Sequence, residues 1–374
     1  MKKRLKKVIS FWLMLLFVLM FSVNAFASDL AVDTAKAWKN TGDIVEFGQY
    51  PQSLVKNSDI ISKLNTLEKK WLSYEYCSGT EMTAGDWMKY CDVTLDGIKY
   101  RAVYFNEYRP CVTSAESTVE VSYQDDNGYV KNNVYYFKFE PIKWRVLESR
   151  YTGYRGKSVE LVVISENILD SQPIENVFYC YDNYEYYYDK DCTVKYTASY
   201  NKSYIRNWLI NDFKKSAFNS VEQGNMGITI RFLNDDENTD KVFLLSNATN
   251  ERFGFSTSHG DDVNRTAKGT DYAKSQGLRT YTDNGNSSYW IYGVGSTYYP
   301  GGIVSNENIS DTGAIDKFGI LNNTTSMGVR PTIQIIAVDS TDYCGYCEDI
   351  HENTFFEQIV AFFHKILDVI KSYF

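Results

Sequence analysis

Histidine is scarce in this chain, which has 3 histidines among 374 residues. Only His259 lies in the body of the sequence, where Asp261 and Asp262 follow it in the stretch STSHGDD. Nucleophilic catalysis needs a serine or cysteine beside a base that a third group orients. No nucleophile-elbow pattern accompanies this histidine. The sequence therefore argues against a triad hydrolase, and we expect His259 to be a solvated loop residue.

An excess of basic residues is also missing. The chain has 39 Lys and Arg against 47 Asp and Glu, which gives a net charge of -8. Nucleic-acid binding depends on a basic patch that neutralises phosphates, and no such patch appears. We therefore exclude nucleic acid as a partner.

Residues 193–343 contain no cysteine, so this part of the chain depends on packing alone. All 7 cysteines lie outside that stretch, and an odd number leaves at least one that is free, bound to a metal or paired between molecules. We expect Cys180 and Cys192 to form a disulfide that closes a short loop. Three others, which have no unique pairing, precede them: Cys77, Cys91 and Cys111.

The N-terminus has the features of an export signal. MKKRLKK is basic, VISFWLMLLFVLMFSV is apolar, and AFA ending at Ala27 has the form of a cleavage site. We expect residues 1–27 to be a signal peptide and 28–41 a linker, with a retained membrane anchor as the alternative. Removal of the leader discards five lysines and arginines, so the net charge becomes -8 - 5 = -13. The protein is expected to be secreted or held in the cell envelope.

The remaining pattern predicts one α+β domain over residues 42–338 with a mainly antiparallel sheet. The Asp96-Gly97 pair between two β-rich runs predicts a type I′ hairpin. Proline cannot donate to a sheet ladder, so we expect the first strand to end at Pro51 and a later strand to break at Pro141. Helices are expected over 58–74 and 201–218, where apolar residues recur at helical spacing. The Gly-, Asn-, Ser- and Thr-rich stretch between DKVFLLS and GVRPTIQIIAV predicts long loops.

Eight ordered motifs carry a resemblance to a known family. They are GDIVEFGQYPQS, YQDDNGY, FEPIKWRVL, ILDSQ, SYIRNWLINDF, DKVFLLS, KGTDYAKSQGL and GVRPTIQI. Together they resemble the bacterial secreted family of domain of unknown function 6273, over roughly residues 42 to 337. The resemblance implies a C-type-lectin-like fold, as in formylglycine-generating enzymes, with a twisted antiparallel sheet, flanking helices and long loops.

The resemblance implies no activity. The copper and thiol chemistry of formylglycine-generating enzymes needs a late cysteine pair, which residues 193–343 lack. Where family members usually have a WWLRSPG-like run, this chain has YWIYGVGS, with Trp290 retained and Tyr292 in place of the arginine. The change alters either a ligand site or only local packing, and we favour packing.

The stretch CYDNYEYYYDKDC is the strongest candidate for a recognition loop. Tyrosine supplies flat, amphipathic contact area at low entropic cost. Its acids could also bind Ca²⁺, but their spacing matches no calcium loop. An inert surface loop is the third interpretation. The loops 176–200 and 250–312 supply the aromatic contact residues that we predict: Tyr184, Tyr186, Tyr187, Trp290 and Tyr292.

The C-terminal tail, residues 339–374, has two features. Cys344, Cys347 and His351 have the spacing of a zinc site, with a Cys344 to Cys347 disulfide as the alternative. Residues 354–374 then form an amphipathic pattern whose charges exclude a transmembrane span. We expect this helix either to pack on the domain or to contact a membrane surface or a partner helix.

These observations favour a secreted or surface-displayed protein that binds an extracellular glycan or protein without catalysis. One alternative is a hydrolase of cell-wall or host glycans that works through two carboxylates, which a convergent acid pair in a cleft would favour. The other is a structural envelope protein with no ligand.

Overall fold

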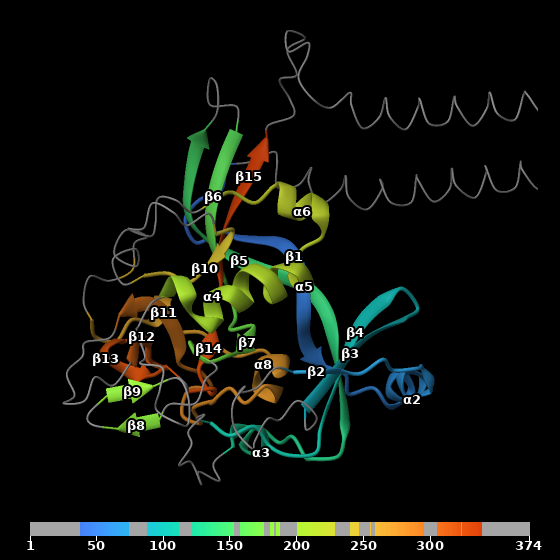
Figure 1. Ribbon diagram of the computed structural model, residues 1–374. Helices are drawn as coiled ribbons and strands as arrows, with labels where there is room; N and C mark the ends of the chain where they lie inside the picture. Colours follow the sequence, from blue (N-terminus) through green and yellow to red (C-terminus); the bar gives the residue numbers. More distant parts are fainter. Residues whose placement is uncertain are drawn as a thin grey trace, which may run out of the picture. The chain divides into compact units, whose positions relative to one another are not determined.

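The structure is a computed structural model of the chain (Figure 1). It describes residues 38–74, 88–111, 122–152, 158–175, 180–182, 185–187, 200–228, 240–246, 255, 259–294, 305–322 and 324–338. All of them belong to one compact unit, residues 1–338, and the second unit, 339–374, lies outside this range. The expected signal peptide and the tail therefore fall outside the described residues. No helix within the described ranges has the length and apolar character needed to cross a membrane.

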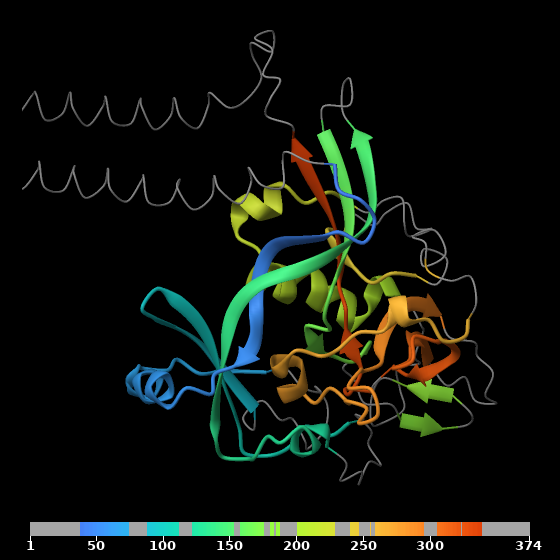
Figure 2. The same cartoon turned by 180° about the vertical axis from the view of Figure 1, so that it is seen from behind.

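The larger sheet is built on two long antiparallel strands, β1 (Ile44–Leu54) and β5 (Val134–Thr152). Figure 2 shows the two running side by side. β4 (Ile98–Phe105) pairs with residues 134–138 of β5, whereas β6 (Ser158–Ser165) pairs with residues 144–152. Because β1 pairs with residues 137–145 of β5, both β4 and β6 lie along the opposite edge of β5. The sheet therefore divides into two branches.

One branch continues from β6 to β15 (Thr332–Val338) and β10 (Val242–Phe243). The other continues from β4 to β3 (Met88–Leu95) and β2 (Leu72–Ser73). β3 and β4 form the expected hairpin, with Asp96 at φ 51° and Gly97 at φ 79°. Positive φ at both turn residues is what a type I′ turn requires, so the Asp-Gly prediction is confirmed.

The two predicted breaks at proline are wrong. β1 continues through Pro51 to Leu54, and β5 continues through Pro141. Pro141 lies in the gap between the segments of β5 that pair with β4 and β6. On that edge of β5 no neighbouring strand pairs with Pro141, so its missing N–H interrupts no ladder of hydrogen bonds. On the other edge, β1 changes register on either side of the paired Gln49 and Pro141. A proline is tolerated where the ladder is irregular.

The two predicted helices are confirmed with shorter or segmented courses. α2 (Ser58–Thr66) begins after Asn57, whose side chain accepts from the backbone N–H groups of residues 59 and 60. The second is a continuous run of three segments, α4 (Tyr204–Trp208), the π-helical η3 (Leu209–Phe213) and α5 (Lys214–Ala217). Ser203 caps it by accepting from the Arg206 N–H. The apolar stripe read from the sequence is the buried one: Ile205, Trp208, Leu209 and Phe213.

The stretch expected to form long loops contributes three of the five strands of a second sheet instead. Its strands, in the order β13-β12-β11-β14-β7, are β13 (Ile315–Leu321), β12 (Ser305–Ile309), β11 (Tyr289–Val294), β14 (Gly328–Val329) and β7 (Asp170–Ser171). Polar residues in β12 obscured the strand in the sequence. Two of them, Asn306 and Asn308, are buried, and the amide of Asn306 donates to the Ile291 carbonyl at 2.6 Å.

Short elements complete the described residues. They are α3 (Tyr123–Asp126), α6 (Ser220–Gly224), α8 (Asp271–Ser275), η2 (Tyr200–Lys202), η4 (Val263–Arg265), β8 (Cys180–Asp182) and β9 (Glu185–Tyr187). The domain is thus α+β with mostly antiparallel sheets, as predicted.

Buried polar side chains tie the two sheets together. Tyr50 in β1 donates its hydroxyl to Asp170 Oδ2 in β7 at 2.7 Å. Arg330, 2% exposed, donates to the carbonyls of Ser165 and Arg265 and to the Tyr289 hydroxyl. These contacts make Arg330 a scaffold residue, because a buried guanidinium needs several acceptors.

Candidate functional site

The main candidate site is a cavity of about 460 Å³ that we call the Arg101 pocket. It lies where the β2–β4 branch, β1, β7, α8 and the helical run 204–217 meet. Its aromatic lining is Tyr50, Tyr74, Tyr90, Tyr204, Trp208 and Tyr272. Its charged lining is Asp92, Lys99, Arg101, Asp170, Asp212 and Lys215. The remaining lining residues are Leu72, Ser73, Gln172 and Ser216.

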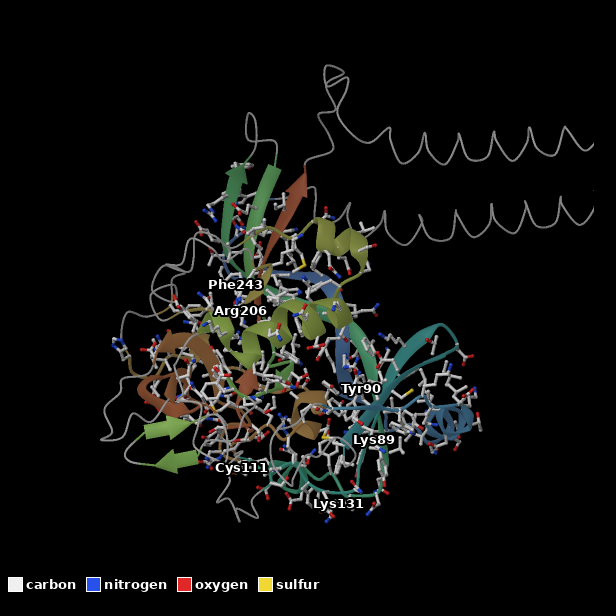
Figure 3. All side chains as sticks on the ribbon, viewed as in Figure 1. Lys89, Tyr90, Cys111, Lys131, Arg206 and Phe243 are labelled. Carbon is white, nitrogen blue, oxygen red and sulfur yellow. The ribbon has the colours of Figure 1, made fainter. Side chains whose placement is uncertain are left out.

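The guanidinium of Arg101 is fixed inside the pocket by several partners. Its Nε and one Nη donate to the two carboxylate oxygens of Asp92 at 2.7 and 3.0 Å. The same Nη lies 3.1 Å from Ser216 Oγ, and the other lies 3.4 Å from the Tyr272 hydroxyl. The guanidinium carbon lies 4.7 Å from the ring centre of Tyr90, which Figure 3 labels beside β3. Such a two-point pair on an aromatic face holds the charge in one orientation.

Asp92 carries the negative charge of this wall. Burial alone would raise the pKa of its carboxyl, but the hydrogen bond from Arg101 and the charges of Arg101 and Lys99 outweigh burial and lower it. Lys99 Nζ lies 3.0 Å from Asp92 Oδ2. Both oxygens of Asp92 are therefore bound by cations of the same pocket.

Asp170 forms the second carboxyl of the pocket and is 1% exposed. Its Oδ2 accepts from the Tyr50 hydroxyl at 2.7 Å, and its Oδ1 accepts from the Ser171 N–H and from Gln172 Nε2. Burial raises the pKa of Asp170, and the hydrogen bonds to its carboxyl only partly offset that effect. Burial also raises the pKa of Tyr50 and, at the neighbouring wall, of Tyr272. Burial is the largest cause of each of these three shifts.

The mouth of the pocket is polar and open. Asp212 and Lys215 are exposed on the helical run, and Leu72 is 56% exposed on β2. The arrangement combines aromatic faces with fixed donors and acceptors, which is the usual composition of a site for a small polar molecule.

The predicted contact aromatics do not meet in this pocket. Trp290 is 1% exposed and donates its indole N–H to the Gln172 carbonyl at 2.8 Å. Its ring is buried in the core behind the pocket residue Gln172, so it has no surface for a ligand to contact. This differs from our prediction that Trp290 is a contact aromatic. Tyr292 is half-buried and packs edge-on against Tyr200, with ring centres 4.6 Å apart.

The tyrosine-rich loop is described only in part. Tyr186 and Tyr187 lie in β9, which pairs with β8, so the loop begins as a small hairpin. Tyr184 lies outside the described residues, as do Cys192 of the predicted disulfide and the tail residues Cys344, Cys347 and His351.

No catalytic or metal centre built from cysteine and histidine occurs in the described part of the chain. Cys91 and Cys111 are free cysteines, and Cys77 is outside the described ranges. His259 is exposed in a loop, as predicted. No group of three or more His, Cys, Asp or Glu with the arrangement of a metal site occurs among the described residues. The predicted Zn²⁺ and Ca²⁺ sites remain predictions.

Sequence reasoning missed the pocket residues, although a signal for them was present. Four of the eight motifs that carry the family resemblance contribute side chains to the Arg101 pocket. GDIVEFGQYPQS supplies Tyr50, and KGTDYAKSQGL supplies Tyr272. ILDSQ supplies Asp170 and Gln172, and SYIRNWLINDF supplies three more lining residues, among them Trp208.

Comparison with known proteins gives a family without an activity. Residues 160–336 match the model of a domain of unknown function, DUF6273. The matched range contributes Asp170, Gln172, Tyr272 and the helical run to the pocket, whereas β1, β3 and β4 lie outside it. No curated protein and no solved structure matches the chain. The second half of this domain is therefore similar to a family of unknown function.

Proposed function

We propose that this protein is a non-catalytic binding protein for an extracellular saccharide and that the Arg101 pocket holds the sugar. The observation that carries the proposal is the convergence of six aromatic and six charged side chains on one cavity of about 460 Å³. Sugar rings have apolar C–H faces that stack on aromatic rings, and hydroxyl groups that pair with carboxylates, amides and guanidinium groups. Pockets of this volume enclose small ligands of one or two rings.

The hydrogen bonding of Asp92 and Asp170, two of the three pocket carboxyls, favours binding over hydrolysis. A glycosidase needs one carboxyl to protonate the leaving oxygen and another to attack or to activate water. Both oxygens of Asp170 already accept hydrogen bonds from the protein, and Asp170 lies behind the Tyr50 hydroxyl. Both oxygens of Asp92 are held by Arg101 and Lys99.

A glycan hydrolase remains the second candidate because one observation favours it. The pKa of Asp170 is raised while that of Asp92 is lowered, and two carboxyls pushed apart in this way are a feature of acid and base pairs. Release of new reducing ends from a bound oligosaccharide would support the hydrolase and refute the non-catalytic proposal.

The expectations from the sequence about fold type, export and the C-terminal tail are part of this proposal. The C-type-lectin-like fold implied by the family resemblance would suit a saccharide site among irregular segments. An exported protein with residues 1–27 removed would meet cell-wall or host glycans. The tail, residues 339–374, would then attach the domain to a membrane surface or partner, with or without zinc.

Binding of the chain from Ser28 onward to an array of glycans tests the proposal. Tyr90→Leu removes the aromatic ring that faces the Arg101 guanidinium. Because Tyr90 is only half-buried, we expect the variant to fold. We expect at least tenfold weaker binding, about 1.4 kcal/mol. The control is Tyr151→Leu, because Tyr151 is 63% exposed, contacts Trp38 and does not line the pocket.

Three outcomes are distinguishable. Binding lost in Tyr90→Leu and kept in Tyr151→Leu supports the pocket. Binding that both variants keep but Tyr186→Ala or Tyr187→Ala loses returns the site to the tyrosine-rich loop. Absence of binding to every glycan refutes the saccharide proposal.

A further inference from the structure

We infer that the saccharide held by the Arg101 pocket carries a carboxylate, so that the ligand class is an oligosaccharide containing a uronic acid. This inference rests on the proposed function and narrows it. It follows from the charges that line the pocket and from the donors that the protein leaves without acceptors.

The pocket gathers basic side chains in an acidic protein. Lys99, Arg101 and Lys215 line it together with the carboxyls of Asp92, Asp170 and Asp212. Asp170 is buried beneath the Tyr50 hydroxyl, and both of its oxygens accept hydrogen bonds from the protein. Three basic side chains therefore meet at one cavity of a chain whose net charge is -8. Basic side chains that line a cavity favour a ligand of opposite charge.

The donor count points to the same ligand. A guanidinium has five N–H groups. Two N–H groups of Arg101 donate to Asp92, one donates to Ser216, and one lies 3.4 Å from the Tyr272 hydroxyl. The fifth, on one Nη, has no acceptor among the described residues. Lys215 is exposed at the mouth and forms no ion pair within the described part of the chain. Two cationic donors are thus available to an anionic group.

The aromatic lining identifies the rest of the ligand as a ring that is not itself cationic. A cage of tyrosines also suits a quaternary ammonium group. Here the Arg101 guanidinium already occupies that position, 4.7 Å from the ring centre of Tyr90, 5.7 Å from that of Tyr272 and 5.9 Å from that of Tyr50. A second cation would meet repulsion, whereas a carboxylate would pair with Arg101 while its sugar ring stacks on the tyrosines.

Calorimetric titration with matched trisaccharides tests the inference. The probes are a galacturonic acid trimer, the galactose trimer that differs from it by reduced carboxyls, and a sulfated galactose trimer. Glucuronic acid and glucose trimers form a second matched pair. We expect at least tenfold tighter binding of an acidic member than of its neutral counterpart, and weaker binding as salt is raised.

Lys215→Gln supplies the variant, because an exposed side chain can be changed without disturbing the core. We expect it to weaken binding of the acidic trimer about three- to tenfold and to weaken any binding of the neutral trimer by a smaller factor. Lys214→Gln is the matched control, since Lys214 is the adjacent residue of α5 and does not line the pocket.

The outcomes separate this inference from the proposed function. Equal binding of acidic and neutral trimers, or binding of neutral sugars alone, overturns the carboxylate assignment and leaves the saccharide site standing. Equal binding of the sulfated and carboxylated trimers shows recognition of any anion and also overturns the assignment. Absence of binding by every sugar, here and on the array, overturns both.

Discussion

Glu175 makes the stability of this domain depend on pH. It is 5% exposed, one carboxylate oxygen accepts from the Tyr204 backbone N–H at 3.3 Å, and its own N–H donates to the Asn322 carbonyl. Burial raises the pKa of its carboxyl from 4.5 to about 7, against the smaller opposing effect of the Tyr204 hydrogen bond. Replacement of Glu175 by glutamine should therefore stabilise the protein at neutral pH.

The sign and size follow from proton linkage. The native state binds the Glu175 proton more tightly than the unfolded state, so its contribution is present below pH 4.5 and is lost as pH rises through about 7. At about 1.36 kcal/mol per pH unit, the span from 4.5 to about 7 corresponds to roughly 3 kcal/mol. Glutamine resembles the protonated acid and keeps an oxygen for the Tyr204 N–H. The variant should match the parent near pH 4 and exceed its free energy of unfolding by up to ~3 kcal/mol at pH 8.

Urea denaturation of parent and Glu175→Gln at steps from pH 4 to pH 8 measures this difference. Other titrating groups, such as Asp170, are present in both proteins and cancel in the comparison. Glu68→Gln is the control for the loss of one acidic side chain, because Glu68 is exposed. A Glu175→Gln difference that is the same at every pH would show that burial of this carboxyl does not set its titration.

Two further pairs of substitutions test the packing and the ion pairs. Gly48→Ala places a Cβ 2.5 Å from an aromatic ring at φ +69° and should cost about 2 to 4 kcal/mol of unfolding free energy, whereas Gly128→Ala, at φ +87° with open space around it, should cost only about 1 kcal/mol. Both are measured by thermal or urea unfolding, and equal losses would refute the steric argument. Arg206→Ala removes the 2.6 Å ion pair with Asp240, whose side chain is 3% exposed, and should cost about 3 kcal/mol. Lys131→Ala removes the exposed ion pair with Glu107 and should cost less than about 0.5 kcal/mol of unfolding free energy (Figure 3). Similar losses for the Arg206 and Lys131 variants would contradict the role of burial.

Local patterns in the sequence predicted local structure well. Asp96 and Gly97 specified a hairpin because few residue pairs tolerate positive φ at both turn positions. The stripe from Ile205 to Phe213 specified a buried helical face because helical spacing alone brings those side chains together. The mixed α+β class followed from the same periodicities.

Predictions that depended on distant partners were less reliable. A proline in a strand is unfavourable only where a neighbouring strand needs its N–H, so the fate of Pro141 depended on the gap between β4 and β6. The strands near Asn306 and Asn308 were missed because buried amides are acceptable once a carbonyl of another strand receives them. The sequence predicted Trp290 as a contact residue, but in the fold its indole N–H donates to the Gln172 carbonyl.

The sequence by itself determined the turns, the helical faces, the acidic charge and the resemblance to a family, because each depends on neighbours within a few residues or on composition. Only the tertiary structure decided the Arg101 pocket. Tyr50, Asp92, Arg101, Asp170 and Tyr272 come from five separate elements. Their contacts join distant parts of the chain, and Arg101 and Tyr272, for example, lie 171 positions apart in the sequence. Their pKa shifts arise from burial and from charges that no local pattern places together.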